Sequence, residues 1–319
     1  MPSNFSHFII AFIGLALFEI ISSIDNAIIN AHVLKTMSER WRKWFLLWGF
    51  LIAVVMVRAL LPWIIVFLSN TKLGFFGSFV ATFSSDPAVQ AAIESSRGLL
   101  LIGGGIYLLF LFLHWLFEEH KEYAFFLEKF IHKQAVWFYA IASVTLTTIV
   151  WIAMEISPSL GLAAVIGSTS FFIVSGFKRS AEEKERQLLH APHLSAVSKI
   201  IYLEMIDASF SIDGVIGAFA FTLSVPIIIL GNGLGAFIVR WGTIKGLEKI
   251  SKYRFLKNGA MYAIGFLGLV MILESFGKHI PVWVPALNTF VLIAIFLYLS
   301  EEEFRIGNFF KKSSVRTGE

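Results

Sequence analysis

The 319-residue sequence has no cysteine, which excludes disulfides, thiolate nucleophiles, iron–sulfur clusters and thiolate sites for soft metals. Charged residues are also scarce, at 15% of the chain against 57% hydrophobic residues, so the sequence lacks the polar surface of a soluble globular protein. The zinc-protease His-Glu-x-x-His, the phosphate-binding loop and the nucleophile elbow are absent as well. We therefore expect a membrane protein that is not an enzyme. Because Glu19 interrupts the first apolar run and no Lys or Arg precedes it, we expect no cleaved signal peptide.

Long apolar runs fill most of the chain and predict an all-α, polytopic membrane protein with about nine transmembrane helices. The predicted spans are residues 8–34, 44–68, 98–117, 135–155, 159–177, 200–223, 226–244, 258–277 and 281–300. Between them we expect a re-entrant or interfacial segment at 70–97, an interfacial helix at 118–133 and a solvated cytoplasmic helix at 178–187.

The 26 Lys and Arg residues are distributed unevenly between the two sides of the predicted membrane. Twenty-one lie in the first, third, fifth and seventh connections and the C-terminal tail, whereas Lys72, Arg97 and Lys278 lie in other connections. By the positive-inside rule the N-terminus is outside and the C-terminus is cytoplasmic. The basic residues thus indicate orientation, and we expect no nucleic-acid partner.

An acidic motif occurs twice, in the first and the sixth predicted span. Glu19, three residues, Ser23-Ile-Asp25, two residues and an isoleucine recur 188 residues later as Asp207, three residues, Ser211-Ile-Asp213, two residues and an isoleucine. The two spans cross the membrane in opposite directions, which predicts an inverted repeat of spans 1–3 and 6–8. Inverted halves with polar helices near the midplane are typical of secondary transporters, whose substrate site lies between the repeats.

The relation extends to the spans that follow, because Arg58 and Arg240 each lie about fourteen residues into their span. We therefore divide the single membrane domain, residues 1–319, into four parts. They are the first repeat half (1–117), the connecting spans with a cytoplasmic linker (118–199), the second repeat half (200–277), and the last span with a cytoplasmic tail (278–319).

Five carboxylates lie within predicted spans, where they would cost on the order of 15 kcal/mol without compensation. They are Glu19, Asp25, Glu204, Asp207 and Asp213. Some could be protonated or paired with Arg58 and Arg240, but two arginines cannot neutralise five ionised acids. A bound divalent cation would largely neutralise the rest, so cation transport is the simplest interpretation.

The available donors are hard oxygen ligands, which suit Mn²⁺, Ca²⁺ or Mg²⁺ better than Cu(I) or Zn²⁺. Besides the carboxylates they include the amides of Asn26 and Asn232 and the hydroxyls of Ser23 and Ser211. At about 100° per residue, Asp213 lies opposite Glu204 on a straight helix. Either the helix unwinds locally near Gly214, or it is regular and Asp213 has a different partner.

The doubled motif resembles the paired signature of the TerC family, integral membrane proteins named for tellurite resistance, and this chain resembles a divergent branch of it. The residues that carry the resemblance are Glu19 with Ser23-Ile-Asp25-Asn26-Ala27, Glu204-x-x-Asp207-x-x-Phe210-Ser211-Ile-Asp213, Asn232-Gly-Leu-Gly-Ala-Phe-Ile-Val-Arg240 and Tyr253-Arg-Phe-Leu-Lys-Asn-Gly-Ala260. The resemblance implies a multi-pass protein of a bacterial inner membrane that exports Mn²⁺ and is related to the LysE-type transporters. It also implies the candidate metal ligands, which are Glu19, Asp25, Asn26, Glu204, Asp207 and Asp213.

Other functions remain open at this point. The chain could be a scaffold in a metal or tellurite stress-response complex, or a Ca²⁺ carrier. An intramembrane enzyme with paired aspartates does not explain why each half also contributes Ser and Arg. We expect the partners to be a divalent metal ion and the lipid bilayer, with no prosthetic group, and we leave a homo-oligomer open.

Overall fold

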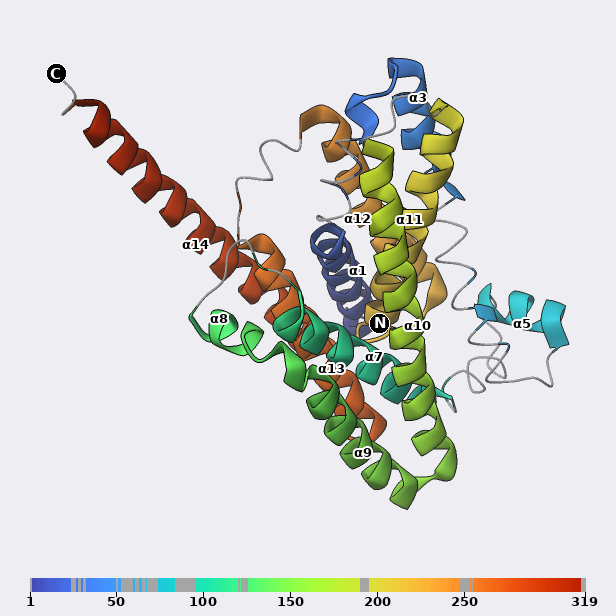
Figure 1. The fold of residues 1–319 in the computed structure, drawn as a ribbon. Helices are drawn as coiled ribbons and strands as arrows, with labels where there is room; N and C mark the ends of the chain where they lie inside the picture. The colour runs from blue at the N-terminus through green and yellow to red at the C-terminus, as the bar shows by residue number, and fades with distance from the viewer. Residues whose placement is uncertain are drawn as a thin grey trace.

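The chain folds into a bundle of helices, shown by a computed structural model in Figure 1. The structure describes residues 2–23, 27, 30, 33–49, 51–52, 60, 63–64, 67, 74–83, 94, 96–119, 121, 126–189, 195–246, 253 and 255–316. All regular secondary structure in these residues is helical. The elements are α1 (Pro2–Ser22), α3 (Glu39–Trp44), a short π-helix η1 (Phe45–Gly49), α5 (Gly74–Phe83), α7 (Arg97–Phe117), α8 (Phe126–His132), a 3₁₀ turn η4 (Ala135–Trp137), α9 (Phe138–Ile156), α10 (Pro158–Leu189), α11 (Ala196–Ala218), α12 (Val225–Gly246), α13 (Leu256–Ser275) and α14 (Trp283–Arg316).

Six segments in the described part of the chain are long and apolar enough to cross a bilayer. They are Arg97–Phe117, Ala135–Ile156, Pro158–Ser180, Val225–Thr243, Leu256–Ser275 and Trp283–Glu301. Large apolar side chains such as Val144, Trp151 and Leu162 are exposed on the outer helices α9 and α10, as expected where lipid replaces water. The predicted all-α, polytopic membrane architecture is confirmed.

Three of the nine predicted spans are not among these six. The first appears as α1, whose apolar part, Ser6–Ser22, is shorter than a full span. The second, 44–68, lies mostly outside the described residues. The sixth appears as α11, which is long enough but carries Lys199, Glu204, Asp207 and Asp213. The total of nine therefore stays a prediction.

Helix α1 lies in the middle of the bundle, where it packs against α11, α12, α13 and α14 (Figure 1). It runs antiparallel to α11. A Cβ atom on Gly217 would lie 2.4 Å from the ring of Phe18, at the C-terminal end of α11. At the other end Lys199 Nζ donates to Thr36 Oγ1 at 3.0 Å, so the chain that follows α1 returns to the start of α11. Opposite directions of these two segments are what an inverted repeat requires.

Glycines allow the central helices to approach closely, which is a common packing mode in membranes. A Cβ atom on Gly167 of α10 would lie 2.1 Å from the carbonyl oxygen of Gly103 on α7. Helices α7 and α13 show a reciprocal contact, because a Cβ atom on either Gly105 or Gly268 would lie 2.9 Å from the carbonyl oxygen of the other. These contacts hold α7 at the core, between α10 and α13.

The predicted connections have local structures of their own. The segment predicted as a separate solvated helix at 178–187 is instead the C-terminal part of α10, which continues unbroken to Leu189. Within 118–133 the described helix is α8, whose buried Glu128 accepts hydrogen bonds from Asn258 Nδ2 at 2.7 Å and Tyr262 Oη at 3.0 Å. Within 70–97 the described helix is α5, which is too short to span and exposes several aromatic side chains.

Candidate cation-binding cavity

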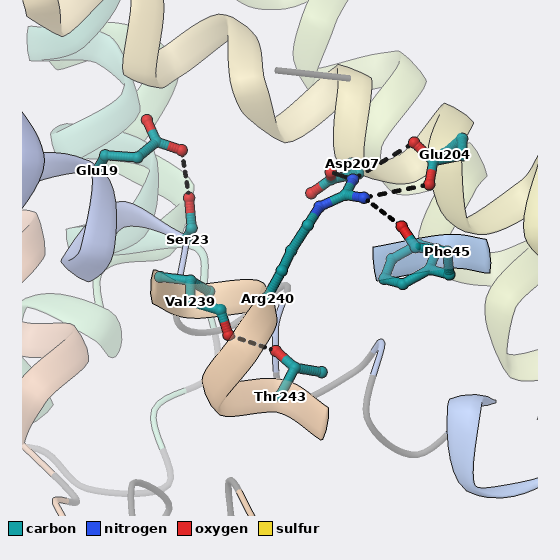
Figure 2. A network of polar contacts seen from close by, with 8 residues as sticks. All are labelled: Glu19, Ser23, Phe45, Glu204, Asp207, Val239, Arg240 and Thr243. Atoms are coloured by element: carbon teal, nitrogen blue, oxygen red, sulfur yellow. Dashed lines mark hydrogen bonds and ion pairs between the residues drawn. The ribbon is translucent and has the colours of Figure 1, made fainter. Parts of the chain in front are cut away.

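A small cavity of about 20 Å³ lies next to α1, α11 and α12. The residues that line it come from both copies of the acidic motif and from α12: Glu19, Ser23, Ala27, Asn30, Asp207, Ala236, Val239, Arg240 and Thr243. Figure 2 shows Glu19 and Ser23 on one side and the Arg240 side chain extending toward Asp207 and Glu204 on the other. Glu19 and Asp207 occupy equivalent positions in the two motifs, and the structure brings them to one cavity.

The carboxyl group of Glu19 is almost completely buried, with 1% of the residue exposed. Its Oε1 accepts a hydrogen bond from Ser23 Oγ at 2.8 Å, one helical turn further along. Two glycines make room for the side chain. A Cβ atom on Gly214 would lie 2.5 Å from Glu19 Oε2, and one on Gly235 would lie 2.7 Å from Glu19 Cβ. The acid reaches its position because α11 and α12 carry no side chains at these two points.

Arg240 lies at the centre of the polar contacts around the cavity (Figure 2). Its Nη1 and Nη2 donate to the two carboxylate oxygens of Glu204 at 3.4 and 3.3 Å, and Nη2 also pairs with Asp207 Oδ2. Nη1 donates to the carbonyl oxygen of Phe45 at 3.0 Å, and the guanidinium carbon lies 4.4 Å from the centroid of the Phe45 ring. The sequence left open whether Arg240 pairs with acids, and the structure shows that it does.

Neutral side chains whose oxygen atoms could bind a cation also lie in or next to the cavity lining. Asn30 is 3% exposed, and its Oδ1 has no hydrogen-bond partner among the described residues. Thr243 also lines the cavity and donates to the carbonyl oxygen of Val239 at 2.8 Å. Asn232 is fully buried and donates from Nδ2 to the carbonyl oxygen of Gly214 at 3.1 Å, which ties α12 to α11 beside Glu19. Carboxylate, amide and hydroxyl oxygens are the donors that hard divalent cations prefer.

Asp213 belongs to a separate cluster. It accepts a hydrogen bond from Tyr107 Oη of α7 at 2.6 Å and forms an ion pair with Lys178 of α10. Helix α11 is continuous through this residue, so the suggested unwinding at Ser-Ile-Asp is wrong for this structure and the alternative of a regular helix holds. Ser211 is buried on the same helix and is not among the residues that line the cavity.

The remaining candidates from the sequence, Asp25, Asn26 and Arg58, lie outside the described residues. Within the residues that are described, no group of three or more His, Asp or Glu side chains is close enough together to hold a metal ion. The described part of the cavity therefore supplies two acids, Glu19 and Asp207, together with an arginine and several neutral oxygens.

Sequence reasoning missed several polar contacts. Asn30 could have been found, because residues 19, 23, 27 and 30 follow the spacing of one helical face. Lys178 was counted as a loop residue, since it follows the last apolar residue of its run. Tyr107 gave no signal, because a tyrosine inside an apolar run looks like an ordinary core residue.

The fold and this cavity define a class: a multi-pass helical membrane protein with a buried, partly charge-compensated polar cavity. The chain belongs to the family described as "Protein of unknown function (DUF475)", whose sequence model matches residues 24–305. It is also similar to the "Uncharacterized membrane protein YceF" of Bacillus subtilis (strain 168), with 27% identity over 107 residues, which cover 33% of this chain and 42% of that protein. No solved structure matches the chain. The resemblance to the TerC family stays a prediction.

Proposed function

We propose that this protein is a membrane transporter that exports a divalent metal cation, with Mn²⁺ as the favoured ion, through the cavity at Glu19 and Asp207. The observation that carries the proposal is the convergence of these two acids, which hold the same place in the two motifs, on one buried cavity. A buried carboxylate is costly inside a membrane unless a counter-charge is available, and intramembrane acids typically mark ion pathways.

The charge balance around the cavity supports a cation as the transported species. Glu19, Glu204 and Asp207 contribute three acidic groups, and Arg240 contributes one positive charge next to two of them. An anion or an apolar substrate would leave this negative charge uncompensated.

The donor set supports a hard cation. The cavity offers carboxylate, amide and hydroxyl oxygens, and the sequence has no cysteine to provide thiolates for Cu(I). These donors alone do not separate Mn²⁺ from Ca²⁺ or Mg²⁺. The choice of Mn²⁺, the direction of export and the bacterial inner membrane as location rest on the resemblance to the TerC family.

The test is a flux measurement with the purified full-length protein in liposomes. We expect the parent chain to move Mn²⁺, and Glu19→Gln to slow the flux by about tenfold or more because the amide keeps the shape but removes a ligand charge. Glu155→Gln is the matched control, because Glu155 is exposed on α9 and accepts a hydrogen bond from Trp151 Nε1 at 3.2 Å. It should transport like the parent.

The other outcomes of this assay correspond to the other functions. Flux of Ca²⁺ without flux of Mn²⁺ would reassign the protein as a calcium carrier. Absence of flux for Mn²⁺, Ca²⁺ and Mg²⁺ in correctly folded protein would reject transport and favour a scaffold in a stress-response complex. Equal flux in the parent and Glu19→Gln would show that the ion takes another route.

A further inference from the structure

The guanidinium group of Arg240 has two different kinds of partner. On one side are the carboxylates of Glu204 and Asp207, both on α11. On the other side are the carbonyl oxygen and the ring of Phe45, in the π-helix η1. Arg240 itself is 5% exposed, so its charge is almost entirely compensated by these neighbours and not by water.

The contacts with Glu204 are long for a charged pair. Distances of 3.3 and 3.4 Å compare with about 2.7–2.9 Å in a strong guanidinium–carboxylate hydrogen bond. A guanidinium spreads one positive charge over a planar group, whereas a divalent cation concentrates two charges on one atom. The Glu204 oxygens are thus ones for which a divalent cation can compete.

Phe45 provides contacts that the guanidinium can keep when it loses the carboxylates. A backbone carbonyl and an aromatic face both attract a cation, and the ring face, unlike the carboxylates, is not a ligand for a hard divalent ion. The segment lies directly over the ion pair, because a Cβ atom on Gly49 would lie 1.9 Å from Glu204 Oε1 and 2.7 Å from Arg240 Nη1. Short π-helices are frequent at functional sites.

We propose that Arg240 is an internal counter-ion that competes with the transported cation for Glu204 and Asp207, and that Phe45 retains the guanidinium when a divalent cation takes these carboxylates. A monovalent ion brings no more positive charge to the carboxylates than the guanidinium that it would displace, whereas a divalent ion brings twice as much. Arg240 therefore makes the cavity selective for divalent cations. This inference rests on the proposed function and adds to it the residue that determines charge selectivity.

The experiment measures Mn²⁺ binding to the purified full-length protein with and without a large excess of Na⁺. Arg240→Gln should bind Mn²⁺ about tenfold more tightly than the parent, a change of about 1.4 kcal/mol. Excess Na⁺ should weaken Mn²⁺ binding to Arg240→Gln, whereas it should leave Mn²⁺ binding to the parent unchanged. Adding guanidinium ion at millimolar concentration should restore the parent's weaker Mn²⁺ binding in Arg240→Ala, because the free ion can occupy the same place.

Three further variants separate competition from a structural role. Arg97→Gln removes an arginine that pairs with Glu94 and Glu274 instead, so it should bind Mn²⁺ like the parent. Arg240→Lys keeps the positive charge and should retain the insensitivity to Na⁺. Phe45→Leu keeps the carbonyl but removes the ring, and it should weaken Mn²⁺ binding because the displaced guanidinium loses part of its second site.

Thermal unfolding in the presence of a chelator provides the folding control. Arg240→Gln should unfold at a lower temperature than the parent, and Mn²⁺ should raise its unfolding temperature more than it raises that of the parent. If the parent binds Mn²⁺ and Arg240→Gln binds it equally or more weakly, the inference is wrong and the proposed function stands. If the parent does not bind Mn²⁺, the proposed function fails and this inference fails with it.

Discussion

At the scale of single residues, Asp207 and Asp213 show how position on one helix separates two tasks. They are six residues apart on α11, which places them on different faces of a regular helix. Asp207 meets Arg240 at the cavity, while Asp213 meets Tyr107 and Lys178 on α7 and α10. Two aspartates that look alike in the sequence therefore have different chemical surroundings, and we expect their substitution to have different effects.

The first prediction concerns these two acids. Asp207→Asn should weaken Mn²⁺ binding by about tenfold or more because it removes a charge at the cavity, whereas Asp213→Asn should change it by less than about threefold. Asp213→Asn should instead lower the free energy of unfolding by about 3 kcal/mol, because it leaves the Lys178 ammonium poorly compensated in a buried place. Binding titrations and thermal unfolding of both purified variants test the prediction.

A second substitution checks the cause of that instability. Lys178→Met in the Asp213→Asn background removes the uncompensated charge and should recover part of the lost stability. If the double variant loses as much free energy of unfolding as Asp213→Asn and Lys178→Met lose together, the two residues do not interact in the folded protein. If Asp213→Asn weakens Mn²⁺ binding as much as Asp207→Asn, both acids serve one site.

At the scale of helices, the bundle depends on contacts between backbones that a single methyl group would prevent. Gly167 on α10 faces the carbonyl oxygen of Gly103 on α7, and the two helices approach without a side chain between them. The same pair of helices provides Lys178 and Tyr107 to Asp213. The close approach thus also determines whether both partners can reach the aspartate.

The second prediction compares two glycines of α10. Gly167→Ala should lower the free energy of unfolding by about 1–3 kcal/mol, because its Cβ would lie 2.1 Å from the Gly103 oxygen and the helices must move apart. Gly176→Ala adds the same atom where, among the described residues, no atom beyond its own stretch of helix lies within 4 Å, so it should be neutral or slightly stabilising. Equal unfolding temperatures of the two variants in detergent would show that α7 and α10 pack differently.

At the scale of the whole molecule, the direction of each half in the membrane determines whether the two acidic motifs are an inverted repeat. The segment after α1 and the start of α11 pack together through Val33, Leu34, Met37, Ile200 and Leu203, so both lie at one end of the bundle. The turn between α13 and α14 belongs to another connection, which carries few basic residues. By the positive-inside rule, the excess of Lys and Arg predicts that the first of these ends is cytoplasmic.

The third prediction is a labelling pattern for single cysteines in the naturally cysteine-free chain. Ser38→Cys and Ser180→Cys, both at exposed positions, should be protected from an impermeant thiol reagent in intact cells. His279→Cys, exposed between α13 and α14, should react. Gly277 is less suitable because its φ of 80° strains any other residue. Reaction at position 180 from outside would contradict the predicted orientation.

The sequence predicted those parts of the fold that depend on hydropathy and periodicity. Apolar runs of about twenty residues gave the helical, multi-pass architecture, and the spacing within α11 showed that Asp213 could not face the same way as Glu204. It did not predict which partner each acid meets, because Lys178 reaches Asp213 from a distant helix and nothing in its local sequence differs from a solvated lysine. The contact of Phe45 with Arg240 is equally non-local, and its carbonyl oxygen is backbone that any residue supplies.

The glycines at 214 and 235 have a consequence for how related chains can vary. Glu19 Oε2 fills the space that a Cβ atom would need at 214, so the volumes of residues 19 and 214 are linked, whereas a Cβ atom at 235 would first meet the carbonyl oxygen of Ala16 at 2.5 Å. A relative with alanine at 214 would have to shorten its acid to aspartate or shift α1 away from α11. Covariation of positions 19 and 214 would therefore appear as a trade between acid length and glycine, and Gly214 determines how much room the end of the Glu19 side chain has.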